Sequence, residues 1–164
     1  MKRTAAKTSP PRKFCYEYPR PAVAVDLVVT RWVKSKSGEK RRELLLIQRK
    51  HDPFAGCWAL PGGFLDEQET LEQAAARELM EETHVVARKL IPLGAFSKVD
   101  RDPRGRVVSF SYATEVPATT CQQAGDDAAA AKWFPVKRLP KLAFDHAEVI
   151  AAARKTWSGT IHRS

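Results

Sequence analysis

The segment from Gly63 to Val85 constrains this chain more than any other part of it. Thr70 and Gln73 make a capping-box pattern, and the stretch LEQAAARELMEE behind Thr70 is rich in strong helix formers. We therefore expect a short helix that begins after Thr70 and ends near Thr83. Three carboxylates fall on its last turns: Glu78, Glu81 and Glu82.

Helical spacing places these carboxylates beside the apolar stripe of the expected helix. Leu71, Ala74 and Ala75 share one face at 3.6 residues per turn, and the stripe continues to Glu78 and Glu82. Like charges at this spacing repel each other, and partly buried carboxylates resist ionising together. A hard divalent cation, Mg²⁺ first and Mn²⁺ next, would remove that penalty. A solvated acidic helix end is the alternative for a Glu-x-x-Glu-Glu pattern taken alone.

The full spacing of the segment resembles the Nudix box, which runs from a glycine through a glutamate and an Arg-Glu pair to a Glu-Glu pair. The matching positions are Gly63, Glu69, Arg77, Glu78, Leu79, Glu81, Glu82 and Val85. One position departs, because His84 stands where the family has a glycine. Histidine tolerates the left-handed conformation of a helix C-cap better than most residues, so we expect modest strain there and a retained fold.

The resemblance implies an α/β fold, the Nudix α/β/α sandwich with a mixed β-sheet between helices. It also implies that Arg77 pairs with Glu69 and holds the glycine loop against the helix. The alternative partner for Arg77 is Glu81, one helical turn further on. The metal ligands implied by the resemblance are Glu78, Glu81, Glu82 and the backbone carbonyl of Gly62.

Stretches outside the box look like the ADP-ribose pyrophosphatase branch of the family and like the Nudix domain of NAD-related regulators. They are Trp58–Phe64, Asp100–Tyr112, Asp126–Ala128 and Ala143–Glu148, and the likeness spans Pro21 to Trp157. It implies Mg²⁺-dependent hydrolysis, with Mn²⁺ as a substitute, of a nucleoside diphosphate linked to another moiety. The foremost substrate is ADP-ribose, split into AMP and ribose 5-phosphate. The alternatives are NADH, a dinucleoside polyphosphate, an oxidised nucleotide, an RNA 5′ end, or a non-catalytic nucleotide-sensing domain.

The base and the substrate contacts are less constrained by the sequence. Phosphoryl transfer needs neutralised phosphate oxygens and a water in line, with a carboxylate to take its proton. That carboxylate is either a glutamate of the box or a residue elsewhere. The candidates outside the box are Asp126 and Asp127, for which a turn or helix cap is the alternative. The candidates for holding a phosphate or a terminal ribose are Arg101, Arg104 and Arg106. For these arginines the alternatives are solvated loop charges or pairs with Asp100 and Asp102.

Several other reactive or aromatic residues receive structural interpretations. His146, beside Asp145 at an expected helix start, is predicted to be a structural hydrogen-bond partner and not a catalyst. We expect Cys57 to pack and not to act as a nucleophile. The aromatic residues ahead of the first strand could stack on a base, but core packing is the default; they are Phe14, Tyr16 and Tyr18.

Composition sets the domain organisation. The 164 residues suit a single domain over 14–164, preceded by a disordered basic tail over 1–13. Three scattered cysteines favour a reducing cytoplasm, and no apolar run suits a membrane span. Few residues follow the last expected helix, so we do not expect the DNA-binding winged helix that the related regulators carry. The resemblance also makes a homodimer possible.

The net charge of +9 favours anionic partners in general. Its excess lies in the tail and in Lys34–Arg42, an expected exposed hairpin loop around Ser37 and Gly38. No aromatic residues alternate with these charges as a single-strand binding surface requires. We therefore expect a small-molecule nucleotide as the partner and not a nucleic acid, with an RNA-end hydrolase or RNA binder as the alternative.

Hydrophobic patterning predicts alternating strands and helices. The expected strands are Ala22–Val33, Leu44–Gln48, Lys89–Lys98, Arg106–Val116 and Ala131–Phe134. Pro53–Gly63 is expected to be a loop and Asp100–Gly105 a polar turn. A last helix is expected to start at Asp145 and to run through Ala153 or beyond.

Overall fold

A mixed seven-stranded sheet runs through the computed structural model, which describes residues 16–35, 38–125 and 128–157. Its strands are β1 (Ala22–Lys34), β2 (Lys40–Arg49), β3 (Trp58–Ala59), β4 (Gly62–Phe64), β5 (Ile91–Phe96), β6 (Val107–Glu115) and β7 (Ala128–Pro135). The helices in this part of the chain are α1 (Leu71–Thr83) and α2 (His146–Trp157). The sheet order is β3-β2-β1-β6-β5, with β4 paired to β1 and β7 to β2. Only the β1–β6 pair is parallel among these strands.

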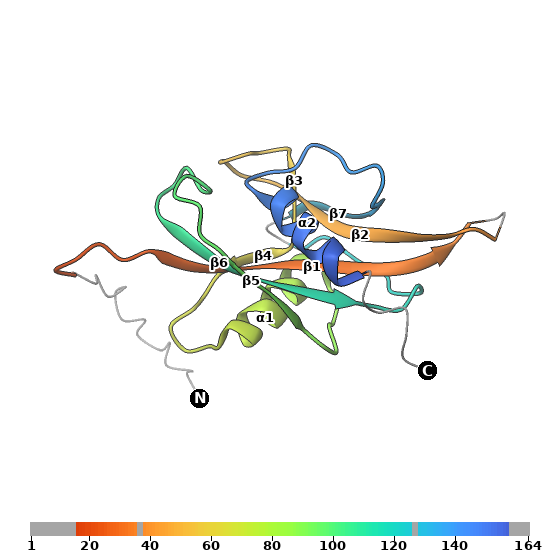
Figure 1. Cartoon of the computed structure of the whole chain (residues 1–164), viewed down its shortest axis with the longest axis horizontal. Helices are drawn as coiled ribbons and strands as arrows, with labels where there is room; N and C mark the ends of the chain where they lie inside the picture. Colours follow the sequence, from red (N-terminus) through yellow and green to blue (C-terminus); the bar gives the residue numbers. More distant parts are fainter. Residues whose placement is uncertain (1–15, 36–37, 126–127, 158–164) are drawn as a thin grey trace, which may run out of the picture.

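The central strand β1 is covered on both faces, which produces the layered sandwich seen in Figure 1. Residues Ala24 to Thr30 are all buried. On one face, Val25, Leu27 and Val29 share a core with α1, whereas Val28 packs with α2 on the other. The side chains of α1 and α2 in these cores are Ala74, Ala75, Leu79, Val149, Ile150 and Ala153. The α/β/α arrangement is confirmed, and the alternation in β1 separates two cores instead of a core from solvent.

Helix α1 begins and ends as its sequence predicts. The Gln73 amide donates to Thr70 Oγ1 at 3.3 Å, and the Thr70 amide donates to Gln73 Oε1 at 2.8 Å. At the other end, His84 takes the left-handed conformation at φ 56° while its amide donates to the Met80 carbonyl at 2.9 Å. The histidine therefore replaces the family's glycine as a C-cap without opening the helix.

One prediction for the loops is wrong. Pro53–Gly63 contains β3 and the start of β4, which are short because each is defined by pairing with a long neighbour, β2 or β1. Asp100–Gly105 is a turn segment, as predicted, although Arg101 and Asp102 within it are buried. The other strands and α2 are confirmed, with ends that differ from the prediction by a few residues.

Some predictions fall outside the described residues. They concern the tail 1–13, Phe14, Ser37, Asp126 and Asp127. Within the described ranges, neither helix has the length and apolar character needed to cross a membrane.

Candidate active site

The glycine loop of β4 lies between β1 and the end of α1. The Gly62 amide donates a hydrogen bond to Glu82 Oε2 at 2.9 Å. A Cβ atom at Gly62, where φ is 153°, would collide with the Val25 carbonyl oxygen. A Cβ atom at Gly63 would collide with the carboxylate of Glu78. Both glycines are therefore required for β4 to pass close to the glutamates.

Arg77 ties this loop to the helix. Its Nη2 donates to Glu69 Oε1 at 2.6 Å and to the Phe64 carbonyl at 3.1 Å. The Glu69 contact is the one expected from the sequence. The alternative contact to Glu81 is present as well, at 3.1 Å, together with one to Glu78 at 2.8 Å. One guanidinium thus donates hydrogen bonds to three carboxylates.

Two of the three candidate ligands are shifted toward the protonated form. Burial raises the pKa of Glu82 to about 8, against the opposing hydrogen bond from the Gly62 amide, and the nearby charge of Glu78 adds to the rise. Burial also raises the pKa of Glu78, although Arg77 opposes it. In contrast, the hydrogen bond from Arg77 lowers the pKa of Glu69 to about 2. Burial therefore disfavours the charged forms of Glu78 and Glu82, and a nearby cation would restore them.

The chemistry of this donor set fits a divalent cation. Glu78, Glu81 and Glu82 line one hollow at the end of α1. Among the described residues no three acidic, histidine or cysteine side chains already converge as a metal cage, because Glu78 and Glu81 are turned to Arg77. A cation in this hollow would find oxygen ligands and would offset both the burial and the neighbouring Glu78 charge that raise the pKa of Glu82.

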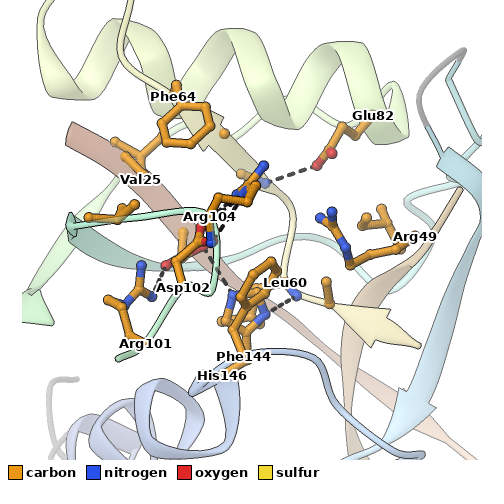
Figure 2. Close-up of a pocket in the computed structure, with 17 residues that line it drawn as sticks. Val25, Arg49, Leu60, Phe64, Glu82, Arg101, Asp102, Arg104, Phe144 and His146 are labelled. Atoms are coloured by element: carbon orange, nitrogen blue, oxygen red, sulfur yellow. Dashed lines mark hydrogen bonds and ion pairs between the residues drawn. The ribbon is translucent and has the colours of Figure 1, made fainter. Parts of the chain in front are cut away.

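Glu82 also faces a pocket on the glycine-loop side (Figure 2). Arg49 from the end of β2 and Arg104 from the β5–β6 link line this pocket with it. The Arg104 guanidinium lies 4.9 Å from the ring centre of Phe64 and 5.7 Å from that of Phe144. Arg49 lies 4.9 Å from the Phe144 ring. Cations and flat rings suited to a nucleotide thus surround a carboxylate of the box.

A buried ionic network forms the floor of the same pocket. Arg101 donates to Asp145 at 2.8 Å and to Asp26 at 3.0 Å, and its side chain is only 5% exposed. Burial would raise the pKa of Asp26, but His146, Ser109 and Arg101 lower it to about 2. The interpretation of Arg101 as a solvated loop charge is wrong, because its two carboxylate partners come from distant parts of the chain.

His146 connects this network to the glycine loop. Its Nδ1 accepts a hydrogen bond from the Leu60 amide at 2.9 Å, and its Nε2 lies 3.3 Å from Asp26 Oδ1. The ring is buried at the first residue of α2. Its predicted role as a structural hydrogen-bond partner is confirmed, and that role is to fix the backbone two residues before Gly62.

The remaining sequence candidates lie in different surroundings. Arg104 pairs with Asp102 at 2.7 Å, as one alternative proposed. Arg106 is not among the residues that line the pocket, and it donates to the carbonyls of Ser97 and Lys98. Tyr16 and Tyr18 are 50% and 72% exposed, so the expectation of core packing for them is wrong.

Sequence reasoning missed three of the pocket's residues, Arg49, Phe64 and Phe144. Only the fold brings these three residues together. Two signals were available: Phe64 belongs to Trp58–Phe64 and Phe144 to Ala143–Glu148, two of the stretches that indicate this branch of the family. Cys57 packs beside Phe144 against a small core, as expected.

Comparison with known proteins agrees with this geometry. The family model described as NUDIX domain matches residues 23–153. The ADP-ribose pyrophosphatase of Methanocaldococcus jannaschii is 46% identical over 81% of this chain and 73% of its own length. A MutT/nudix family protein from Enterococcus faecalis superposes with a TM-score of 0.80 at 34% identity, over 93% of this chain and 68% of that one.

A regulator is similar as well. The NUDIX domain of Shewanella oneidensis NrtR, solved with ADP ribose, has a TM-score of 0.74 at 34% identity, over 85% of this chain and 90% of that chain. NrtR has also been solved with a 27mer DNA. From the match over most of its length, together with the spacing of the acidic helix and the glycine loop, this chain belongs to the Nudix family.

Proposed function

We propose that this Nudix protein hydrolyses the pyrophosphate bond of ADP-ribose, with Mg²⁺ as cofactor, to AMP and ribose 5-phosphate. The observation that carries the proposal is the pocket in which Glu82 stands opposite two arginines and two aromatic rings. The 46% identity to an ADP-ribose pyrophosphatase and the likeness to a domain solved with ADP ribose support the same substrate.

Different pocket residues bind different parts of the substrate. Arg49 and Arg104 supply charge for the two phosphates, and Phe64 and Phe144 offer flat faces for the adenine or the terminal ribose. The free cavity measures only about 50 Å³, because Arg104 lies between the two rings. A nucleotide needs several times that volume, so substrate entry displaces the Arg104 side chain.

Glu78, Glu81, Glu82 and the Gly62 carbonyl would hold the metal. When bound, a divalent cation supplies the positive charge that phosphoryl transfer needs on the phosphate oxygens. Arg77 and Glu69 keep the glycine loop against the helix, so that the ligands stay in place. Asp126 and Asp127 remain the proposed bases outside the box, to take the proton of the attacking water.

A substrate panel tests the proposal. The purified protein is incubated with ADP-ribose, NADH, a dinucleoside polyphosphate, an oxidised nucleotide and a capped RNA, each with Mg²⁺ or Mn²⁺ and with EDTA. We expect AMP and ribose 5-phosphate from ADP-ribose, with the highest kcat/KM of the panel and none with EDTA. If another compound had the highest kcat/KM, ADP-ribose would be the wrong substrate, but the proposed metal-dependent pyrophosphate hydrolysis would stand. ADP-ribose binding without turnover of any compound would instead support a sensing domain like that of NrtR.

Two further expectations accompany the enzyme proposal. They are a cytoplasmic location and a homodimer, and both stay predictions.

A further inference from the structure

A second hollow lies at the opposite end of the β1–β2 hairpin from the proposed active site. This groove of about 970 Å³ is lined by residues from β1, β2, the link after β7, and α2. Trp32 on β1 is six residues beyond Asp26, which puts the groove roughly 20 Å from the pocket at about 3.3 Å per residue. We call it the basic groove, and its chemistry differs from that of the pocket.

Positive charge dominates the basic groove. Its cations are Lys40, Arg41, Arg42, Lys137, Arg138 and Arg154, against the two carboxylates Glu39 and Glu115. Three of them have structural partners: Arg41 pairs with Glu43, Arg42 with Glu115, and Arg154 donates to the Val136 carbonyl. The side chains of Lys40, Lys137 and Arg138 are exposed and make no ion pair with other described residues. They are available to an anionic ligand.

Aromatic rings stand among these charges. The Arg42 guanidinium lies 4.7 Å from the ring centre of Trp32 and 4.6 Å from that of Trp157, so it stacks between the two tryptophans. Trp32 nevertheless remains 44% exposed. A base can therefore stack on Trp32 while its phosphates reach the free lysines and Arg138.

We propose that the basic groove binds single-stranded nucleic acid, apart from the pyrophosphatase site. A groove that follows the backbone with cations and offers rings for stacking is the common solution for single strands. The groove exceeds the volume of one nucleotide, and its free cations come from two separate elements, which favours a strand over a mononucleotide. In the sequence these aromatics and cations fall in three separate stretches, around residues 32–42, 137–138 and 154–157, and only the fold brings the stretches together.

Fluorescence anisotropy with a labelled oligouridylate of about 12 nucleotides tests the proposal on the full chain. The variant is Lys137→Gln with Arg138→Gln. The matched control is Arg88→Gln with Lys89→Gln, which removes the same charge from an exposed segment before β5. We expect about a tenfold loss of affinity in the groove variant at low salt. The slope of log affinity against log salt should also fall by about 1.4, since each lost phosphate contact removes about 0.7. The control should keep the slope to within about 0.7.

A second variant separates stacking from charge. Trp32→Leu should weaken binding about tenfold with an unchanged salt slope, because stacking releases no counterions. Thermal melting verifies that each variant is folded. Because anisotropy measures binding and not turnover, the result does not depend on the proposed hydrolase activity. Three results would overturn the inference: equal losses in the groove variant and its control, equal affinity for a duplex, or equal competition by AMP.

Discussion

Two acidic clusters lie at the pocket, and they contain carboxylates whose pKa values are shifted in opposite directions. At the end of α1, burial raises the pKa of Glu82 to about 8, whereas on the pocket floor the pKa of Asp26 falls to about 2. Both carboxylates line the same pocket. Asp26 has His146, Ser109 and Arg101 as partners, whereas the Glu82 carboxylate has one backbone amide as its partner, with Glu78 and the more weakly acting Arg49 nearby.

The difference indicates that Asp26 has a structural role, whereas Glu82 is available to a ligand. In the floor network, Arg101 supplies the positive charge for both Asp26 and Asp145. The α1 cluster has one arginine for several glutamates, so it lacks positive charge that a ligand would supply. Loss of water alone does not distinguish the two, since burial acts to raise the pKa of both carboxylates. The partners that surround each carboxylate do.

The largest expected effect is on catalysis. Glu82→Gln removes a ligand charge without changing the size of the side chain, so kcat should fall roughly a thousandfold, equivalent to about 4 kcal/mol. Thermal stability should stay equal or rise, because a carboxylate that resists ionisation is gone. The assay follows AMP release from ADP-ribose. Glu148→Gln, which changes an exposed carboxylate on α2, is the control, and equal activity of the two variants would contradict the metal assignment.

On the pocket floor the expected effect is on stability. Arg101→Met leaves Asp26 and Asp145 without their shared cation, which should cost about 3 kcal/mol and lower Tm by about 10 °C. Differential scanning calorimetry measures the change. The control is Arg106→Met in the same link, which loses only hydrogen bonds to two exposed carbonyls. Equal Tm values for the two variants would show that the floor network adds no more to stability than the exposed hydrogen bonds of Arg106.

Metal binding should stabilise the protein through the α1 cluster and not through the floor network. Mg²⁺ at about 100 times its Kd should stabilise the folded protein by about 2.7 kcal/mol, and EDTA should reverse the gain. At one fixed Mg²⁺ concentration the gain should be larger at pH 8 than at pH 6, because the ligands bind metal only when ionised and the pKa of Glu82 is about 8. Thermal shifts of wild type and Glu82→Gln measure it. A full shift in the variant would place the ion elsewhere.

The two clusters should also give opposite pH dependences of stability without metal. The raised pKa of Glu82 means that its contribution is complete below about 4.5 and is lost as the pH rises toward about 8. The lowered pKa of Asp26 means that its contribution is complete above about 3.8 and is lost as the pH falls toward about 2. Urea unfolding should show Glu82→Gln removing on the order of 2 kcal/mol of the loss between pH 5 and 8. Asp26→Asn should remove only the loss at acid pH, and interchanged effects would contradict the comparison.

The sequence predicts the α1 cluster far better than the floor network. Capping at Thr70, the Arg77–Glu69 pair and the left-handed His84 are all local, within one helix and the turn before it. Arg101 is held by partners 75 and 44 residues away, so only the assembled sheet shows that it is buried. The meeting of Arg49 with Phe144 depends on the sheet in the same way. Local patterns therefore locate the acidic helix, and long-range packing determines what surrounds it.

The smallest expected effect separates stability from chemistry at the end of α1. His84 holds φ at 56°, a conformation that costs a residue with a side chain about 1 kcal/mol and costs glycine much less. His84→Gly should therefore raise the free energy of unfolding by up to about 1 kcal/mol, less whatever the 3.2 Å contact of its ring with the Gln123 carbonyl contributes. Because His84 belongs to neither acidic cluster, kcat should stay unchanged. His84→Ala, which keeps a Cβ and loses the ring, is the matched control and should be less stable than wild type. If kcat fell in His84→Gly although the protein was more stable, the strained C-cap would itself position the glutamates, and the α1 cluster would depend on its backbone as much as on its charge.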